Sequence, residues 1–325
     1  MRDRMVLNDS VRCQPDSLFF LFSAGKPVVA LAVHLLAQRG SLSLDDPIAE
    51  YWPEFGQRGK QDITIRHVLQ HRGGLPVARG MPLDALDMTD WDASIRSIEQ
   101  AVPAYPAGRV VAYHILTFGF ILGEVLQRVT GVALRDFVAC ELLSPLGVGD
   151  VYLGLPPQLW DRHVPITGRG PAELVTQLVI NRQATWQAVI PAASVSATAA
   201  GLARLYQALL DGGQPVLRSE TIASATQPSS DGEIDRYLHL PIRWSQGFQL
   251  GGERPGTSRV GGGFAPMGSL ASRRTFGHNG SYVCLGWADP ERQVAMAYLT
   301  SRLVSRSVGV RHMSAVSDAV LAAYS

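Results

Sequence analysis

The sequence predicts an α/β protein of the α+β type, in which an antiparallel sheet is flanked by terminal helices and joined to a mostly helical region. Three short apolar segments near the C-terminus, 275–277, 283–288 and 294–300, are typical of strands. Asp289-Pro290-Glu291 separates the last two and is typical of a hairpin turn. The middle of the chain instead shows helical periodicity, and apolar helices are expected near both ends.

Composition limits the classes of partner. With 325 residues, 46% of them hydrophobic, the chain is long enough to bury a substantial core. A net charge of +1 without charged blocks predicts neither nucleic acid nor a membrane surface as a partner, and leaves a small or uncharged substrate open. Cys13, Cys140 and Cys284 are scattered, which suits a reducing compartment. Because residues 1–12 also lack a secretory signal pattern, we expect a cytoplasmic protein.

The apolar run at 18–37 has the length of a membrane span, but Lys26 and Pro27 interrupt it near its middle. A strand followed by a buried core helix is the better interpretation. We expect Ser23 to be the N-cap of this helix, which then runs through Val28–Gln38.

Further helices follow. Thr64 is expected to cap a helix that ends at Gly73-Gly74, and Phe118–Thr130 has clear helical periodicity. Ser196–Leu210 predicts another helix, and Met313–Tyr324 a last one that packs on the sheet.

The regions are expected to form one catalytic unit. Residues 1–54 and 241–325 are predicted to supply the sheet region, and residues 55–240 the mostly helical region. The triplet Gly261-Gly262-Gly263 lacks the strand–turn–helix setting of a phosphate-binding loop, so we interpret it as a flexible turn.

The sharpest chemical feature is Ser23-Ala24-Gly25-Lys26. A lysine three residues after a serine at a helix start lies on the same face, within reach of the hydroxyl. Burial lowers the pKa of a lysine, and a neutral amine can accept the serine proton. Lys26 is one of two lysines in a chain whose 29 basic residues are otherwise arginine, which cannot be neutralised in this way. The bare motif is weak, but its apolar context favours a nucleophile.

Two further features add to this pair. Tyr113 follows a Pro-Ala-Gly turn and precedes a buried helix, where its phenol could point at Ser23 and Lys26 or simply pack in the core. His278 lies in Phe276–Ser281 among small residues that let a substrate approach the backbone, where an N–H group can stabilise an oxyanion.

Together these motifs resemble the class C β-lactamases and family VIII carboxylesterases of the penicillin-binding-protein/β-lactamase group. The order is Ser-x-x-Lys, then a tyrosine, then His-x-Gly on a late strand. The likeness extends over most of the chain, in the segments Leu42–Trp52, Ile63–Pro76, Tyr113–Gly131, Val195–Gly213 and Phe276–Tyr298. It implies a β-lactamase/transpeptidase-like fold.

The resemblance also implies roles for individual residues. Ser23 would form the acyl-enzyme, Lys26 would take or shuttle its proton, and Tyr113 would be the partner acid/base. The backbone N–H groups of Ser23 and Ser281 would form the oxyanion hole. His278-Asn279-Gly280 would line the edge strand where the substrate docks.

Other residues are open to two interpretations. Trp186, Phe248 and Tyr282 fit the walls of an acyl pocket and fit ordinary core or rim positions equally well. His67 and His71 have the i, i+4 spacing of metal ligands, but without a third ligand nearby structural roles are favoured. No metal or cofactor is expected.

Three departures from the family pattern refine the prediction. Ile115 stands where the resembled β-lactamases have an asparagine that contacts the substrate amide, and His278 stands where they have a lysine that meets a carboxylate. Both favour uncharged esters. The resembled enzymes also carry a helix and two strands before the nucleophile, more than 22 residues can hold, so we expect a shortened start.

The sequence therefore predicts a carboxylesterase-type serine hydrolase that acts on small esters. A β-lactamase or D-amino-acid peptidase, an acyltransferase of a biosynthetic pathway, and a non-catalytic binding protein on the same fold remain alternatives.

Overall fold

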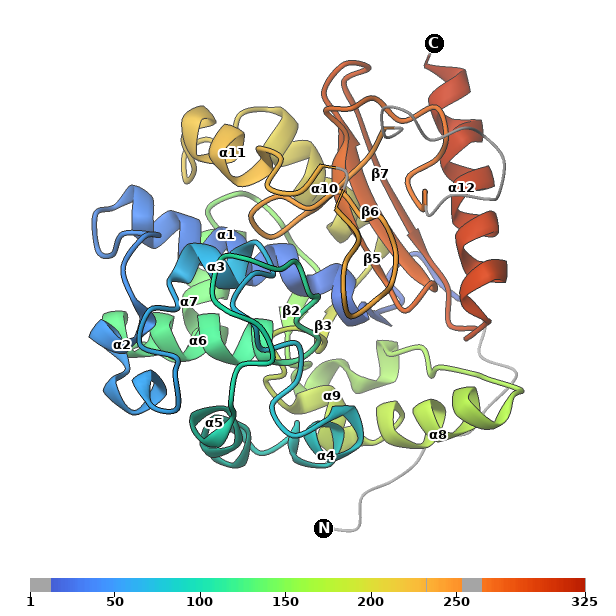
Figure 1. The fold of residues 1–325 in the computed structure, drawn as a ribbon. Helices are drawn as coiled ribbons and strands as arrows, with labels where there is room; N and C mark the ends of the chain where they lie inside the picture. The colour runs from blue at the N-terminus through green and yellow to red at the C-terminus, as the bar shows by residue number, and fades with distance from the viewer. Residues whose placement is uncertain (1–12, 232, 253–264, 325) are drawn as a thin grey trace.

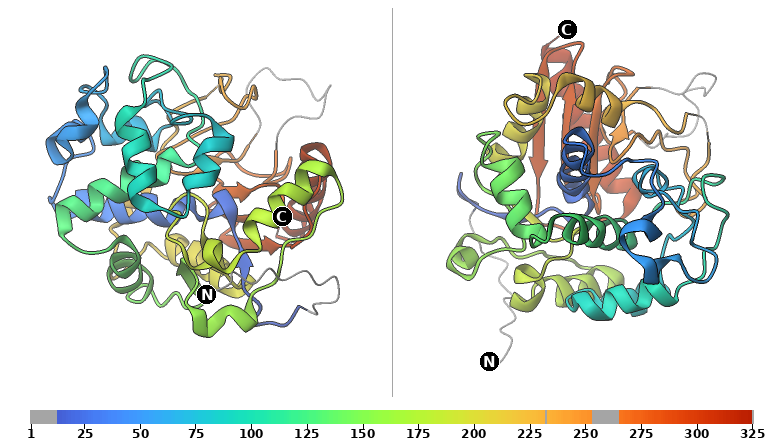
Figure 2. Two further views of the ribbon diagram at one scale, coloured as in Figure 1. Left: turned by 90° about the horizontal axis from the view of Figure 1, so that it is seen from below. Right: turned by 90° about the vertical axis from the view of Figure 1, so that its left-hand side faces the viewer.

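A buried helix, α1 (Lys26–Gln38), runs through the middle of the protein, between the C-terminal sheet and a layer of helices (Figures 1 and 2). The computed structural model describes residues 13–231, 233–252 and 265–324. Residues 1–12 and the triplet Gly261–Gly263, for which we predicted a turn, lie outside the described residues. Helix α1 is buried from Lys26 to Leu36 and carries mostly apolar side chains, as expected of a helix without a solvent face there.

The larger sheet has four antiparallel strands in the order β4-β5-β6-β7. Its strands are β4 (Gln249–Leu250), β5 (Phe276–Gly280), β6 (Cys284–Asp289) and β7 (Val294–Leu299). The three predicted strands correspond to β5, β6 and β7, and the hairpin between the last two is confirmed. A smaller sheet has the order β1-β3-β2, with β1 (Phe19–Phe20), β2 (Val151–Leu153) and β3 (Val195–Ala197). These strands of two or three residues are too short to give a strong pattern, and β2 and β3 were not predicted.

Among the described residues of 55–240, helices are the main regular structure, and β2 and β3 are the only strands. The α-helices after α1 are α2 (Ile48–Tyr51), α3 (Ile65–Leu69), α4 (Met81–Asp87), α5 (Trp91–Gln100), α6 (Thr117–Thr130), α7 (Leu134–Phe137), α8 (Pro171–Ile180), α9 (Gln183–Gln187), α10 (Ala199–Leu210), α11 (Ser219–Thr226) and α12 (Arg306–Ala323). The shorter helical segments are η1 (Phe22–Gly25), η2 (Pro53–Gly56), η3 (Val138–Leu143) and η4 (Pro157–Arg162).

The two faces of the larger sheet are covered by different helices. On one face, Trp287 of β6 packs with Met313 and Leu321 of α12, and its indole N–H donates to Ser317 at 3.1 Å. On the other face, Gly286 lies against Tyr206 of α10, where a Cβ atom would come within 2.4 Å of the phenol ring. The predicted C-terminal helix is confirmed, but it begins earlier than expected.

The entry to α1 differs from the prediction. Ser23 is not the N-cap: it lies within the 3-10 turn η1, and the N-cap of α1 is Gly25. A Cβ atom at Gly25 would lie 2.6 Å from Cβ of Val195 in β3, so the close approach of the small sheet requires a glycine here. The strand β3 thus packs directly against the turn that precedes the helix.

Two predicted helices in the middle of the chain are present with changed ends. Thr64 caps α3 as predicted, in a capping box in which the His67 side chain accepts from the Thr64 N–H at 3.2 Å. The helix ends at Leu69, short of the predicted Gly73-Gly74. Among the described residues no single helix has the length and apolarity of a membrane span; α6 meets that test only together with the sharply bent segment Leu134–Leu143.

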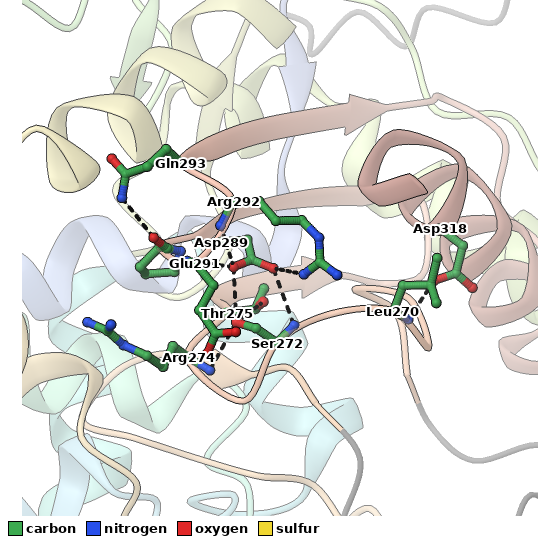
Figure 3. Close-up of polar contacts among 10 residues, drawn as sticks. Leu270, Ser272, Arg274, Thr275, Asp289, Glu291, Arg292, Gln293 and Asp318 are labelled. Carbon is green, nitrogen blue, oxygen red and sulfur yellow. Dashed lines mark hydrogen bonds and ion pairs between the residues drawn. The ribbon is translucent and has the colours of Figure 1, made fainter. Parts of the chain in front are cut away.

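The hairpin between β6 and β7 is held by the buried carboxylate of Asp289 (Figure 3). It accepts hydrogen bonds from the Ser272 hydroxyl at 3.0 Å, from the Glu291 N–H at 2.9 Å and from the Arg292 guanidinium at 2.9 Å. Burial alone would raise the pKa of Asp289, but hydrogen bonds from the N–H and hydroxyl of Ser272, from the Glu291 N–H and from the Thr275 side chain hold the pKa below its usual value. The turn therefore depends on an ionised carboxylate.

We expect Asp289→Ala to lower the free energy of unfolding by about 3 kcal/mol at neutral pH, because several buried donors lose a charged acceptor. Since the folded-state pKa is depressed, this stabilisation is present above the unfolded-state pKa and is lost as the pH falls through the folded-state pKa. Urea denaturation of both proteins at neutral and acidic pH measures the difference. The exposed Asp211→Ala is the control. A difference that stays constant into acid would contradict the prediction.

Candidate active site

Ser23 lies in a strained turn between β1 and α1. The preceding residue, Phe22, has a left-handed backbone with φ of +48°, which is unusual for a bulky side chain. The Ala24 N–H donates to the carbonyl of Leu21 at 3.0 Å, which closes the turn. The turn leaves Ser23 half-buried at the start of α1, between buried neighbours on both sides.

Lys26 lies one turn further on and is wholly buried. Its Nζ atom is 3.2 Å from Ser23 Oγ and donates to the carbonyls of Ile115 at 2.8 Å and Ala192 at 3.3 Å. Burial of the amine, which makes no ion pair with any described residue, lowers the pKa of Lys26 well below its usual range. The Lys26 amine therefore loses its proton more readily than that of an exposed lysine, and it does so next to a hydroxyl group.

Tyr113 lies beside this pair, where the sequence predicted it. Its ring centroid is 4.8 Å from Lys26 Nζ. Burial raises the pKa of Tyr113 above its usual range, and a hydrogen bond with the Ser23 side chain opposes this shift. The side chains of Lys26 and Tyr113, from two distant parts of the sequence, thus both contact the Ser23 hydroxyl group.

The end of β5 packs against the Ser23 turn. A Cβ atom at Gly280 would lie 1.9 Å from the carbonyl oxygen of Leu21 and 3.0 Å from the Ala24 nitrogen, so only glycine fits. Ser281 and Tyr282 follow with left-handed backbones, at φ of +44° and +62°. The predicted oxyanion donors, the N–H groups of Ser23 and Ser281, therefore belong to two strained turns in direct contact.

The position of β5 in the sheet refines one expectation. We predicted that His278-Asn279-Gly280 would line an edge strand; β4 pairs with β5 only at Phe276 and Gly277, so these three residues lie on the part of β5 that β4 leaves uncovered. The larger sheet begins at β4 because Gln249–Leu250 provides a short antiparallel partner. The predicted docking residues lie just past the end of that partner.

His278 is buried and uncharged. Burial, reinforced by the nearby Lys26, lowers the pKa of His278 to about 3, so the ring is neutral at physiological pH. Its Nδ1 atom lies 2.7 Å from the carbonyl oxygen of Asn279, which can only accept, so Nδ1 carries the proton. Nε2 then has a lone pair without a partner among the described residues.

Two of the three proposed pocket walls are core residues. Trp186 in α9 is buried and stacks on His163, with ring centroids 4.0 Å apart. Phe248 has no exposed surface and packs edge-on against Phe276 behind β5. Tyr282 is half-buried beside the site, where Arg306 of α12 hydrogen-bonds its hydroxyl. The core interpretation therefore holds for Trp186 and Phe248, since neither presents surface to a ligand.

Sequence reasoning missed a buried carboxylate behind the tyrosine. Asp235 accepts from the Tyr113 N–H at 3.1 Å through one oxygen and from the Trp244 indole N–H at 3.1 Å through the other. Trp244 stacks on Tyr113, with ring centroids 5.2 Å apart and planes 9° apart. Asp235 thus fixes both members of the stack, and no local motif reveals this contact across 122 residues of sequence.

His71 is a second residue that the sequence did not place. Its ring centroid is 4.8 Å from that of Tyr113, and its Nδ1 atom accepts from the His114 N–H at 3.2 Å. Burial, with His114, Lys26 and His278 nearby, lowers the pKa of His71 well below its usual value. Among the described residues no group of three His, Cys, Asp or Glu side chains is arranged to hold a metal ion.

Comparisons with known proteins, by sequence and by structure, agree on one family. The sequence matches the family model described as Beta-lactamase over residues 2–319. It is 31% identical over 331 aligned residues to the esterase/beta-lactamase LipL of Mycobacterium tuberculosis. This alignment covers 91% of this chain and 72% of LipL. The crystal structure of a family VIII carboxylesterase is similar in fold, with a TM-score of 0.77 and 26% sequence identity over 95% of this chain and 85% of that one. The crystal structure of a penicillin-binding protein homologue from Caulobacter crescentus is also similar, with a TM-score of 0.75 and 29% identity over 95% of this chain and 85% of that one.

Proposed function

The chain belongs to the Beta-lactamase family, and we propose that it is a carboxylesterase-type serine hydrolase that forms an acyl-enzyme on Ser23. The observation that carries this proposal is the buried Lys26 amine, 3.2 Å from the Ser23 hydroxyl oxygen. A buried amine with a lowered pKa is a proton acceptor, and a serine is a weak nucleophile without one. The esterases among the relatives support the same reaction class.

The acylation step follows from the hydrogen bonds of Lys26. A neutral amine has two N–H donors and one lone pair, and the carbonyls of Ile115 and Ala192 accept the two donors. The lone pair is then left for the Ser23 hydroxyl. As Ser23 Oγ bonds to the ester carbonyl carbon, its proton passes to Lys26, and the carbonyl π electrons move onto the oxygen, next to the N–H groups of Ser23 and Ser281.

Collapse of this intermediate breaks the bond to the alcohol. The alcohol leaves with a proton from Lys26, and the Tyr113 phenol either passes this proton on or hydrogen-bonds the leaving oxygen. A water molecule then gives one proton to the regenerated base and attacks the acyl carbonyl carbon; the bond to Ser23 Oγ breaks and that proton returns to Oγ, so that the carboxylic acid and free Ser23 result. Tyr113 keeps its proton before the reaction because its pKa is raised. It is therefore suited to donate a hydrogen bond to the leaving oxygen.

Two features favour an ester over a β-lactam with its anionic carboxylate. Ile115 supplies only a backbone carbonyl, to Lys26, and its side chain has no amide to contact a substrate amide. His278 is neutral, so it offers no positive charge to a substrate carboxylate. We therefore propose small uncharged carboxylic esters as substrates.

Labelling by a fluorophosphonate tests the nucleophile directly. We expect intact-protein mass spectrometry to find a single adduct on the wild-type chain and none on Ser23→Ala, because among the described serines Ser23 is the one within hydrogen-bond reach of a lysine amine. Hydrolysis of p-nitrophenyl butyrate, assayed in parallel, should be lost in the same variant.

Ser281→Ala is the matched control. It removes an exposed hydroxyl at the same site but keeps the backbone N–H that the mechanism uses. It should therefore still be labelled. Absence of any adduct on folded wild-type protein, or equal labelling of Ser23→Ala, would refute the proposal.

A further inference from the structure

The segment of β5 beyond β4 is the place where an extended substrate would be expected to add as a strand. β4 pairs only with Phe276 and Gly277, so the next backbone groups on the same side of β5 are those of Asn279, two residues on. Recognition by strand addition needs a free N–H and C=O at such an edge. The Ser281 N–H is already assigned to the oxyanion, so Asn279 holds the other N–H that an added strand could use here.

Both backbone groups of Asn279 already hydrogen-bond to side chains of the protein itself. Its N–H donates to the Gln249 side-chain oxygen at 3.2 Å, and its carbonyl accepts from His278 Nδ1 at 2.7 Å. The Asn279 side-chain amide also donates to the same Gln249 oxygen at 2.8 Å. Gln249 is itself 4% exposed and fixed in β4, so this contact is not a loose surface interaction.

We propose that Gln249 is a specificity-determining residue that closes the edge of β5 to substrates that carry a backbone-like amide next to the ester. This inference rests on the proposed esterase function and narrows its substrate class to esters held at the carbonyl group and by apolar contacts. A substrate amide would have to displace the Gln249 oxygen from two buried donors, and would gain one hydrogen bond for the two that are broken. Peptide-like acyl donors are thus disfavoured by the fold, independently of Ile115.

Matched pairs of esters test this inference. On the acyl side, the p-nitrophenyl ester of N-acetylglycine is compared with that of pentanoic acid, which has the same chain length without the amide. On the alcohol side, the butyrate ester of N-methylglycolamide is compared with butyl butyrate, with hydrolysis followed by proton release. The measured quantity is the ratio of kcat/KM for the amide ester to that for its alkyl counterpart.

For the wild-type enzyme we expect both ratios, after correction for the alkaline hydrolysis rates of the same esters, to be at or below about one. Gln249→Met keeps the volume but removes the acceptor, and should raise at least one ratio by about tenfold, the contribution of a single hydrogen bond. Gln249→Ala should act in the same direction. Gln246→Met, at a buried glutamine that bonds Ser224 instead of β5, should leave both ratios unchanged.

The outcomes separate the two proposals. A wild-type enzyme that prefers an amide ester tenfold, or Gln249 variants that hydrolyse the alkyl esters with unchanged ratios, would overturn the role of Gln249 and leave the esterase function intact. A wild-type protein that hydrolyses none of the four esters would instead remove the proposed function and this inference with it.

Discussion

Lys26→Met should lower kcat/KM for p-nitrophenyl butyrate by about 10³-fold or more, because a general base in this position contributes 10²–10⁴-fold and no second described amine lies next to Ser23. In the wild-type enzyme, kcat/KM should rise with pH as Lys26 loses its proton. Since burial lowers the pKa of Lys26 well below its usual range, the plateau should be reached at a pH where an exposed lysine is still protonated. Steady-state kinetics across pH measure both effects.

Lys26→Arg separates the chemistry from the charge. Arginine keeps a positive charge and hydrogen-bond donors at this position but does not lose its proton. The Lys26→Arg enzyme should therefore be as inactive as the Lys26→Met enzyme. Circular dichroism and thermal melts show whether each variant is folded. An active Lys26→Arg enzyme would exclude Lys26 as the proton acceptor.

Gly280→Ala should reduce kcat/KM by about 100-fold or more while the protein still folds. The new methyl group would meet the Leu21 carbonyl at 1.9 Å, so the end of β5 must move away from the Ser23 turn. A displacement of about 1 Å between reacting groups can cost 10²-fold, and the overpacking itself should cost about 1–3 kcal/mol of stability. Kinetics and urea denaturation measure the two losses separately.

Gly149→Ala is the matched control, because a Cβ atom at Gly149 would meet nothing within 4 Å. It should leave activity and stability close to those of the wild type. A Gly280→Ala enzyme with near-normal kcat/KM would contradict the placement of Ser281 in the oxyanion hole.

The parts of the site that the sequence predicted are those that depend on local geometry. Ser23 and Lys26 are three residues apart at a helix start, so their contact follows from the helical repeat. The β6–β7 hairpin follows from strand patterning and its turn residues. Tyr113 was placed beside Ser23 by the family resemblance, since no spacing rule brings residues 90 positions apart together.

The parts that were missed or left open depend on tertiary packing. Asp235 contacts Tyr113 across 122 residues, and no local pattern marks it. For Trp186 and Phe248 the sequence left a pocket wall and a core position equally open, because an aromatic residue has the same sequence pattern in both; the structure places them in the core. The pairing of Gln249 with β5 involves a strand of two residues, below the length at which alternation is visible.

The close packing of Gly280 on the Leu21 carbonyl also has a consequence for folding kinetics. The nucleophile turn lies near the beginning of the chain, but the strand that supports it lies near the end, so this contact forms only after a very long loop has closed. In chains whose β5 has not yet packed against the Ser23 turn, the oxyanion donor from Ser281 is therefore missing. Such chains should not react with the fluorophosphonate. The rate at which refolding protein becomes reactive should report the last long-range step, and lag behind the recovery of helical signal.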